Sequence, residues 1–432
     1  MSGDPYTPQS GDPNLSIEHY ELELDYKVST NRLSGTATVS GYVRAATSSL
    51  SLDLVGLRAS KVSAAGRKLA FHQSDRKLRV SLGTTWEPGE RFSVSVVYAG
   101  APRPRRSRWG TIGWEELEDG VIVASQPTGA PTWFPCNDLP SDRATYLLTF
   151  TTESAYTVIA GGATTSSTRG GKTTWTFRRD IPTATYLATV QIGRYLAKPI
   201  PFSAVRGEIH YPQAIESRVL ADFEDLPAMM KVFEESFGPY PLPDYRVVVT
   251  EDELEIPLEA QGVGIYGANH ADGLGGSRRL IAHELAHQWF GNSVGLSQWR
   301  DIWLNEGFAC YAEWIWSERS GGPTADEKAL MHHARLRLLA QDIVLGDPGP
   351  DLMFDDRIYK RGALTLHAIR RTVGELLFFR LLHAWAGRFA GKTATTDDFV
   401  ALAEEVTGVP LAQLIHSWVS EPRLPALPAR AA

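Results

Sequence analysis

The sequence predicts an α+β fold, with a β-rich amino-terminal region followed by a mainly helical one. From Ser16 to about Leu196, apolar and polar residues alternate in short runs separated by turn-forming residues, which is typical of antiparallel strands. Beyond about Pro201 the apolar spacing becomes mostly helical. We therefore expect two domains, residues 1–198 and residues 199–432.

The composition indicates a folded chain with room for at least two domains, since it has 432 residues and is 43% hydrophobic. The 43 basic and 50 acidic residues give a net charge of −7, which argues against a general nucleic-acid binder. No apolar run approaches the ~20 residues that span a membrane, and the first twenty residues carry no secretory signal. Cys136 and Cys310 are too few for a disulfide framework and are interpreted as buried thiols. We expect a cytoplasmic protein without nucleic-acid or membrane partners.

In the β-rich region, strands are predicted where the alternation is clearest, at residues 20–26, 50–54 and 92–98. Four arginines interrupt the pattern near two prolines: Arg103, Arg105, Arg106 and Arg108. This basic cluster is interpreted as a solvated loop, with contact to an acidic partner as the alternative.

In the second region, a helix is predicted at residues 217–237, because a helical apolar pattern ends there at Gly238 and Pro239. A run of β-branched residues predicts a strand at 246–250. The remaining predictions are helices at 375–389, 396–407 and 411–419, then a ragged end at 421–432.

The segment with the clearest chemical meaning is H-E-x-x-H, formed by His283, Glu284 and His287. In a helix, histidines at i and i+4 project from one face, so both imidazoles can bind one zinc ion. Glu306, nineteen residues after His287, begins a second helical pattern and is the expected third ligand, which leaves a fourth position for water. Glu284 is then free to accept a proton from that water. The alternative is a buried amphipathic helix whose histidines only pack, which would not explain the second carboxylate.

With these residues in place, the sequence resembles the gluzincin zinc metallopeptidases of the aminopeptidase N family. The family follows H-E-x-x-H with N-E-G-F-A, which reads Asn305 to Ala309 here. The block Phe134 to Pro140 is similar to the family's F-P-C-x-D-x-P, with Leu139 in place of the usual acid. The resemblance implies a saddle-shaped β domain followed by a thermolysin-like catalytic domain. Larger members continue into a helical domain, so we expect this chain to have a more open cleft, or one closed by a partner subunit.

The resemblance also implies roles for three further residues. Glu259 stands where the family's G-x-M-E-N motif places the glutamate that binds a substrate's α-amino group, although Ile256, Leu258 and Ala260 replace the glycine, methionine and asparagine. Gln126, counted back from the F-P-C block, would assist Glu259, and Tyr359 would donate a hydrogen bond to the oxyanion. The alternatives are an exposed acid, an ordinary loop glutamine and a core or rim tyrosine.

Together these residues predict a zinc-dependent aminopeptidase that binds peptides with a free amino terminus and carries one Zn²⁺ per chain. Two alternatives remain open. One is a zinc hydrolase of the same fold without strict exopeptidase preference, acting on internal peptide bonds or on an epoxide or other non-peptide. The other is a non-catalytic scaffold, in which metal ligands are usually lost. The sequence carries no signal for the oligomeric state or for the side chain preferred at the substrate's first position.

Overall fold

The computed structural model describes residues 3–430, and its internal contacts divide the chain into two compact units. The first unit runs to Pro199 and also contains Arg206–Glu216 and Pro243–Asn269. The second contains Ile200–Val205, Ser217–Leu242 and the chain from His270 onward. Strands dominate the first unit and helices the second, so the predicted α+β class is confirmed.

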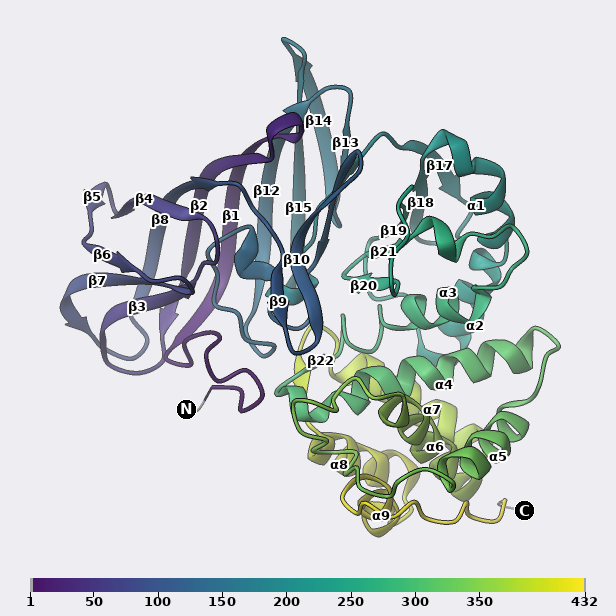
Figure 1. Ribbon diagram of the computed structural model, residues 1–432. Coiled ribbons are helices and arrows are strands. Elements are labelled where there is room, and N and C mark those ends of the chain that lie inside the picture. The colour runs from purple at the N-terminus through teal and green to yellow at the C-terminus, as the bar shows by residue number, and fades with distance from the viewer. Residues whose placement is uncertain (1–2, 431–432) are drawn as a thin grey trace. The chain divides into compact units, whose positions relative to one another are not determined.

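The first unit is built around a mostly antiparallel eight-stranded sheet, whose long strands lie side by side in Figure 1. Only β1 and β12 pair in parallel among its neighbours in the described register, with Tyr20 opposite Tyr146. In spatial order its strands are β14 (Ala163–Arg169), β15 (Lys172–Ala184), β12 (Arg143–Glu153), β1 (Leu15–Lys27), β2 (Arg32–Val43), β8 (Arg91–Gly100), β4 (Arg58–Ala64) and β5 (Arg67–Lys68).

Three smaller sheets complete the first unit, and two of them are built only from strands before residue 194. They are β3 (Thr47–Asp53), β7 (Lys77–Trp86) and β6 (Phe71–Gln73), and β13 (Thr157–Ile159), β16 (Gln191–Gly193), β11 (Gly120–Ala124), β10 (Gly110–Leu117) and β9 (Arg105–Ser107). The third is mixed and contains β17 (Leu196–Ile200), β18 (Arg206–Tyr211), β19 (Asp244–Val249), β21 (Val263–Tyr266) and β20 (Leu258–Ala260).

One apolar core joins the strands that the alternating pattern predicts. The inward residues of β1, β3 and β8, such as Leu22, Leu52 and Val94, are fully or almost fully buried in it. Aromatic pairs extend this core, with Tyr20 stacked on Tyr146 at 5.0 Å between ring centroids. Since successive side chains of a strand point to opposite faces, the alternation in the sequence is what places one face of each strand inside.

The second unit consists of helices, with one short parallel pair, β22 (Gly295–Leu296) and β23 (Thr393–Ala394). No helix in residues 3–430 is both long and apolar enough to cross a membrane. The helices are α1 (Glu216–Asp222), α2 (Leu226–Phe237), α3 (Arg278–Ala286), α4 (Trp303–Arg319), α5 (Ala325–Leu336), α6 (Asp356–Val373), α7 (Glu375–Arg388), α8 (Thr396–Thr407) and α9 (Ala412–Val419). Short 3-10 helices occur at Val28–Thr30, Ala130–Thr132, Thr185–Leu187, Gln213–Ile215, Ala268–His270 and Trp299–Asp301.

The single helix predicted at 217–237 is wrong, because two helices, α1 and α2, occupy this span. Pro227 lies in the first turn of α2, where its missing N–H removes no helical hydrogen bond. A proline inside a continuous helix would have removed one, so the chain breaks before it. Gly238 ends α2 with a φ of 97°, as the stop signal in the sequence predicts.

The close approach of α4 and α6 positions the site of the second unit. A Cβ on Gly307 would lie 2.7 Å from the Cα of Gly362, so the two backbones nearly touch at this point. Both glycines therefore leave room for the crossing that sets Glu306 on α4 and Tyr359 on α6.

Candidate metal centre

Both histidines of the H-E-x-x-H motif lie at the carboxyl end of α3. His283 is in its last turn, and His287 caps the helix with its N–H donating to the carbonyl of His283 at 3.2 Å. The helical path therefore continues through both, and their ring centroids are 4.7 Å apart. The spacing in the sequence thus brings the two imidazoles to one face of α3.

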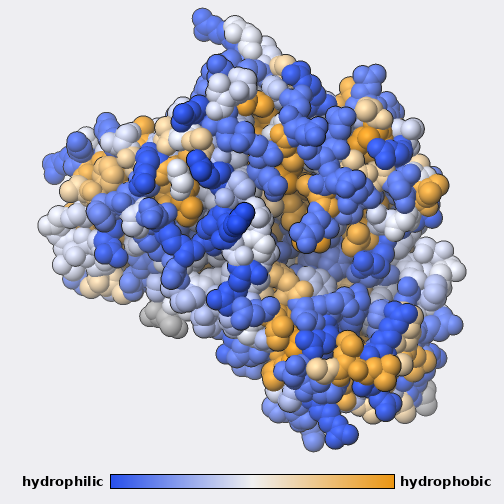
Figure 2. Space-filling model, in the orientation of Figure 1, coloured by the Kyte–Doolittle hydropathy of each residue, from blue (hydrophilic) through white to orange (hydrophobic). Residues whose placement is uncertain are grey.

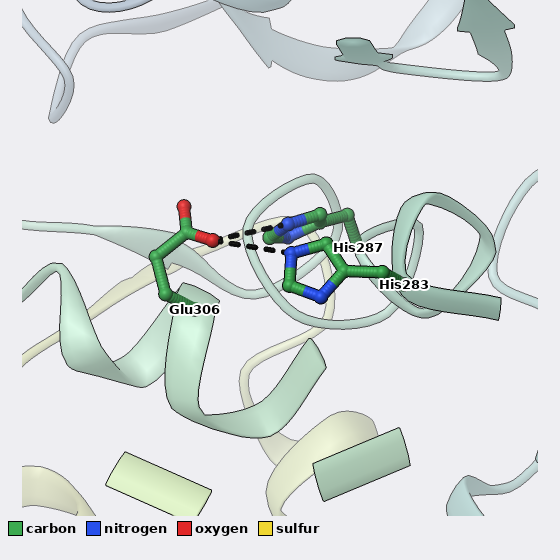
Figure 3. A group of neighbouring side chains, drawn as sticks. All are labelled: His283, His287 and Glu306. Atoms are coloured by element: carbon green, nitrogen blue, oxygen red, sulfur yellow. Dashed lines mark hydrogen bonds and ion pairs between the residues drawn. The ribbon is translucent and has the colours of Figure 1, made fainter. Parts of the chain in front are cut away.

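Glu306, in the first turn of α4, completes a group of three metal-ligand side chains (Figure 3). Its Oε2 lies 3.4 Å from the Nε2 of His283 and 3.4 Å from the Nε2 of His287. One ligand atom from each residue lies within 4.8 Å of the others, and all three residues are buried. Two imidazoles and a carboxylate converging in this way fit a catalytic zinc ion, which takes three protein ligands.

The electrostatics of the three residues favour a bound cation. Burial lowers the pKa of His283, but hydrogen bonds to Glu306 and Glu313 outweigh this and raise it to about 10. Burial raises the pKa of Glu306, but the charges and hydrogen bonds of His287 and His283 outweigh burial and lower this pKa to about 2. A positive charge close to the buried carboxylates is therefore stabilised, and either a proton or a metal ion can supply it.

The second nitrogen of each imidazole is held by the protein. The Nδ1 of His283 lies 2.8 Å from Oε1 of Glu313, and the Nδ1 of His287 lies 3.0 Å from the carbonyl oxygen of Phe290. Such partners fix the tautomer and the ring orientation of a metal-binding histidine. Sequence reasoning missed Glu313, although it stands two helical turns after Glu306 on the same face of α4. Asp301, the acid that precedes α4, has a different partner, because it accepts a hydrogen bond from the Thr396 hydroxyl at 2.6 Å.

Two further residues of the second unit adjoin this group. Glu284 is buried beside His283 on α3, and its charge is among the causes that raise the pKa of His283. Tyr359, half-buried in the first turn of α6, lies with its ring 5.8 Å from the His283 ring and nearly parallel to it. The structure therefore brings together five predicted site residues, namely His283, Glu284, His287, Glu306 and Tyr359.

Aromatic side chains pack against one another along the segments that carry the three residues. Phe290 packs on Phe308 at 4.6 Å between ring centroids, Trp289 lies edge-on to Phe237 at 5.9 Å, and Trp303 lies edge-on to Phe399 at 5.8 Å. Trp289, Phe290 and Trp303 are all buried. Buried apolar side chains near a metal site lower the local dielectric constant and so strengthen electrostatic interactions with a bound ion.

Gln126 and Glu259, both in the first unit, form a pair of their own. The Nε2 of Gln126 donates to Oε1 of Glu259 at 2.8 Å. Glu259 is buried on β20, opposite Gly264 of β21, so it is not the exposed acid that its acidic neighbourhood would allow. The pairing joins residues that are 133 positions apart in the chain, and sequence reasoning related them only through the family resemblance.

Two family models match this chain. The peptidase M1 N-terminal domain matches residues 16–187, and the peptidase family M1 domain matches residues 221–418. The two matches cover the β-rich and the helical regions respectively.

Curated relatives and solved structures agree with these matches. A leucyl aminopeptidase of Saccharolobus solfataricus is 24% identical over 95% of this chain and 54% of its own length, and aminopeptidase M1-A of Oryza sativa is 26% identical over 72% and 38%. The chain thus spans about half or less of these relatives' length. A two-domain M1 zinc metallopeptidase mutant with bound L-arginine superposes with a TM-score of 0.91 at 31% identity over 100% of both chains. A zinc metallopeptidase mutant of Deinococcus radiodurans with a bound Tyr-Ser-Ala substrate superposes equally well, at 31% identity over 99% of both chains.

Proposed function

Because the chain belongs to peptidase family M1, we propose that it is a zinc-dependent aminopeptidase that releases the first residue of peptides with a free amino terminus. The observation that carries this proposal is the buried convergence of His283, His287 and Glu306, with Glu284 and Tyr359 as neighbours. The similarity to a leucyl aminopeptidase and to a two-domain zinc metallopeptidase supports it.

In this proposal His283, His287 and Glu306 hold one zinc ion. Bound zinc supplies a Lewis acid that polarises the scissile carbonyl and increases the acidity of water. The Glu284 carboxylate accepts the proton that the attacking water loses and delivers it to the leaving amine. The Tyr359 hydroxyl donates a hydrogen bond to the carbonyl oxygen as negative charge develops there, which typically contributes a few kcal/mol.

Exopeptidase selectivity is assigned to Glu259 and Gln126. The buried Glu259 carboxylate would pair with the α-ammonium group of the substrate, and the Gln126 amide holds that carboxylate in a fixed orientation. A substrate without the ammonium group would leave a buried charge unpaired, which costs several kcal/mol. The similar protein with a bound Tyr-Ser-Ala substrate supports a peptide as the class of substrate.

We also propose a division into a saddle-shaped β domain, residues 1–198, and a thermolysin-like catalytic domain, residues 199–432. The two family matches fall on either side of this boundary and support it. A cytoplasmic location is proposed as well, and the two buried free thiols support it, because disulfides are rare in reducing compartments. Fractionation of cells that produce the tagged protein tests the location.

The experiment that tests the activity compares aminoacyl reporter amides with their N-acetylated counterparts. The zinc-loaded protein should cleave the free-amine series and leave the acetylated series intact, and Glu284→Gln serves as the blank. Equal cleavage of both series would point to an endopeptidase, and no cleavage above the blank would favour a non-peptide hydrolase or a scaffold. A protein without stoichiometric zinc would identify the scaffold.

A matched pair of variants tests whether Glu259 binds the α-ammonium group of the substrate. Glu259→Gln keeps the size of the side chain and removes its charge, so it should raise KM for free-amine substrates at least tenfold and reduce discrimination against acetylated ones. Glu255→Gln removes an exposed charge from the same acidic stretch and should leave both values unchanged. Equal effects of the two variants would contradict the assignment.

A further inference from the structure

A second candidate site lies in the first unit, where the N-terminal segment faces the β9–β10 hairpin and Arg76. It is a cavity of about 260 Å³, here called the arginine cavity. Its walls combine four arginines with hydroxyl-bearing side chains and one indole, and they include Arg76, Arg105, Arg106, Arg108, Trp109 and Thr128. Within the described chain, the lining contains no carboxylate. Figure 2 shows strongly hydrophilic side chains gathered over the β9 region of this face.

Arg105 is the most constrained guanidinium of the arginine cavity. It donates to the Thr128 hydroxyl through one terminal nitrogen, while its buried Nε has no hydrogen-bond partner among the described residues. Burial, and next the charge of Arg76, lower the pKa of Arg105, whereas Asp138 and Asp53 act in the opposite direction. A half-buried cation held beside a second cation is stabilised by an anion that contacts both.

Contacts to neutral groups hold several of the side chains that line the arginine cavity. Arg76 donates one terminal nitrogen to the side-chain oxygen of Gln9, a neutral partner. The hairpin turn is closed by Ser107, whose hydroxyl donates to the carbonyl of Gly110 at 2.9 Å and accepts from the N–H of Trp109 at 3.1 Å. Arg108 lies over the Trp109 ring, 5.7 Å from its centroid. Ser107, Arg108 and Trp109 are therefore held by contacts within the hairpin.

We propose that the arginine cavity binds a small phosphate-bearing anion, such as a diphosphate or a phosphate ester. Guanidinium forks match the oxygens of a tetrahedral oxyanion and bind them bidentately, and the nearby hydroxyls add neutral donors. A doubly charged anion satisfies two guanidiniums at once, which a single carboxylate does not. The volume of about 260 Å³ also exceeds what one inorganic phosphate ion needs, which favours the larger anions.

The test measures binding of pyrophosphate and of inorganic phosphate to the zinc-loaded full chain by titration calorimetry, with sodium chloride at matched ionic strength as reference. Saturable binding is expected, with pyrophosphate tighter than phosphate. Arg76→Gln removes an exposed side chain and should weaken binding at least tenfold without affecting folding, and Arg105→Gln should do the same. Because phosphate also coordinates zinc, only the component lost in these variants is assigned to the cavity.

Arg103→Gln is the matched control, because Arg103 is an exposed arginine of the same segment that does not line the cavity. It should change the dissociation constant less than twofold. Equal weakening by Arg103→Gln and Arg76→Gln would overturn the proposal in favour of a diffuse positive surface. Binding of an acidic peptide without binding of pyrophosphate would also overturn it, since the cavity would then be a docking site for a protein. Cleavage of reporter amides is measured separately, so failure here and failure of the proposed peptidase activity are distinguishable.

Discussion

At the scale of single residues, Glu313 offers a test of how the metal centre is oriented. Its carboxylate holds the Nδ1 of His283 at 2.8 Å and also pairs with Arg279 at 3.0 Å. Glu313→Gln keeps the shape and weakens the acceptor, so the affinity for zinc should fall by about 10- to 100-fold. Competition with a chromogenic chelator measures this affinity directly, without reliance on peptidase turnover.

Glu318→Gln is the control for this prediction. Glu318 lies on the same helix, but its carboxylate pairs with Arg370 at 3.1 Å and accepts from the N–H of Ala325 at 3.0 Å. Its substitution should leave zinc affinity unchanged even where it lowers the melting temperature. If both variants lost zinc equally, a general loosening of α4 would explain the result, and the orienting role of Glu313 would be excluded.

His367 on α6 makes the stability of the second unit depend on pH. Its Nε2 lies 3.1 Å from Asp326 and its Nδ1 lies 3.1 Å from the Tyr311 hydroxyl, which accepts in turn from Arg370. With the proton on Nε2 and Tyr311 donating to Nδ1, the neutral ring is fully bonded. Burial, opposed by Asp326, lowers the pKa of His367 from 6.5 to about 4. The folded state therefore favours the neutral ring.

The direction in which the stability changes with pH follows from this lowered pKa. Above pH 6.5 the ring is neutral in both states and the stabilisation is complete. Between pH 6.5 and about 4 the unfolded chain takes up the proton first, so the free energy of unfolding falls, by at most about 1.4 kcal/mol per pH unit for this one group. Urea unfolding at pH 7, 6, 5 and 4.5 should show a shallower decrease for His367→Gln than for the parent. His72→Gln, which changes an exposed histidine, should keep the parental slope, and a shared slope for all three proteins would contradict the prediction.

Residue spacing accounts for the part of the site that the sequence could predict. His283 and His287 are fixed by helical geometry, and Glu306 by a carboxylate at the start of the next helix. The orienting partners are different, because the Phe290 carbonyl is a backbone atom that no residue type reveals. Glu313 could have been found from the face it shares with Glu306, but only after α4 was known to pack its acidic face on α3.

At the scale of helices, the crossing of α4 and α6 depends on two glycines. Gly307→Ala would place a Cβ 2.7 Å from the Gly362 Cα, and the neighbour is backbone that cannot rotate away. We expect Gly307→Ala to lower the free energy of unfolding by about 1–3 kcal/mol, as overpacking does, and to reduce peptidase activity by displacing Glu306 relative to Tyr359. Chemical denaturation and reporter-amide kinetics measure the two effects.

Gly387→Ala is the matched control for the crossing. Gly387 is an exposed glycine inside α7, and a Cβ there would meet no atom within 4 Å. Alanine is the better helix former, so this variant should be stabilised by roughly 0.5–1 kcal/mol with unchanged activity. Destabilisation by both substitutions would show that glycine is required for a reason other than the close approach of α4 and α6.

Two helices that the sequence predicted closely each have one exposed face. The predicted helix at 396–407 is α8, and that at 375–389 is α7 within one residue, because each buries a single apolar stripe. The ragged end predicted at 421–432 is wrong for its described part. His333 donates to the carbonyl of Pro425 at 2.7 Å, and Arg371 donates to the carbonyl of Pro428 at 2.9 Å. These side chains hold the segment through its backbone, although its sequence has no periodic apolar pattern.

At the scale of the whole molecule, substitution of Arg246 tests which parts of the chain unfold together. This buried arginine of β19 donates to the carbonyls of Ala160 at 2.7 Å and Gly162 at 3.1 Å and pairs with Asp244 at 2.6 Å. It thereby joins the mixed five-stranded sheet to the β-domain loop that precedes β14. Removing one partner of a buried ion pair costs about 3–5 kcal/mol, so Arg246→Gln should destabilise the first unit strongly.

Hydrogen exchange read by mass spectrometry locates the effect. If the mixed sheet and the β domain unfold as one unit, Arg246→Gln accelerates exchange both in β19 to β21 and in residues 158–164, while α7 to α9 keep their protection. Arg206→Gln, an exposed partner of Glu208 at 2.9 Å, should alter the stability by less than about 1 kcal/mol. If only β19 to β21 exchanged faster, the sheet would unfold independently of residues 158–164. The proposed boundary at residue 198 would then describe the cooperative domains better than the two compact units, in the first of which Pro243–Asn269 lies with the β domain.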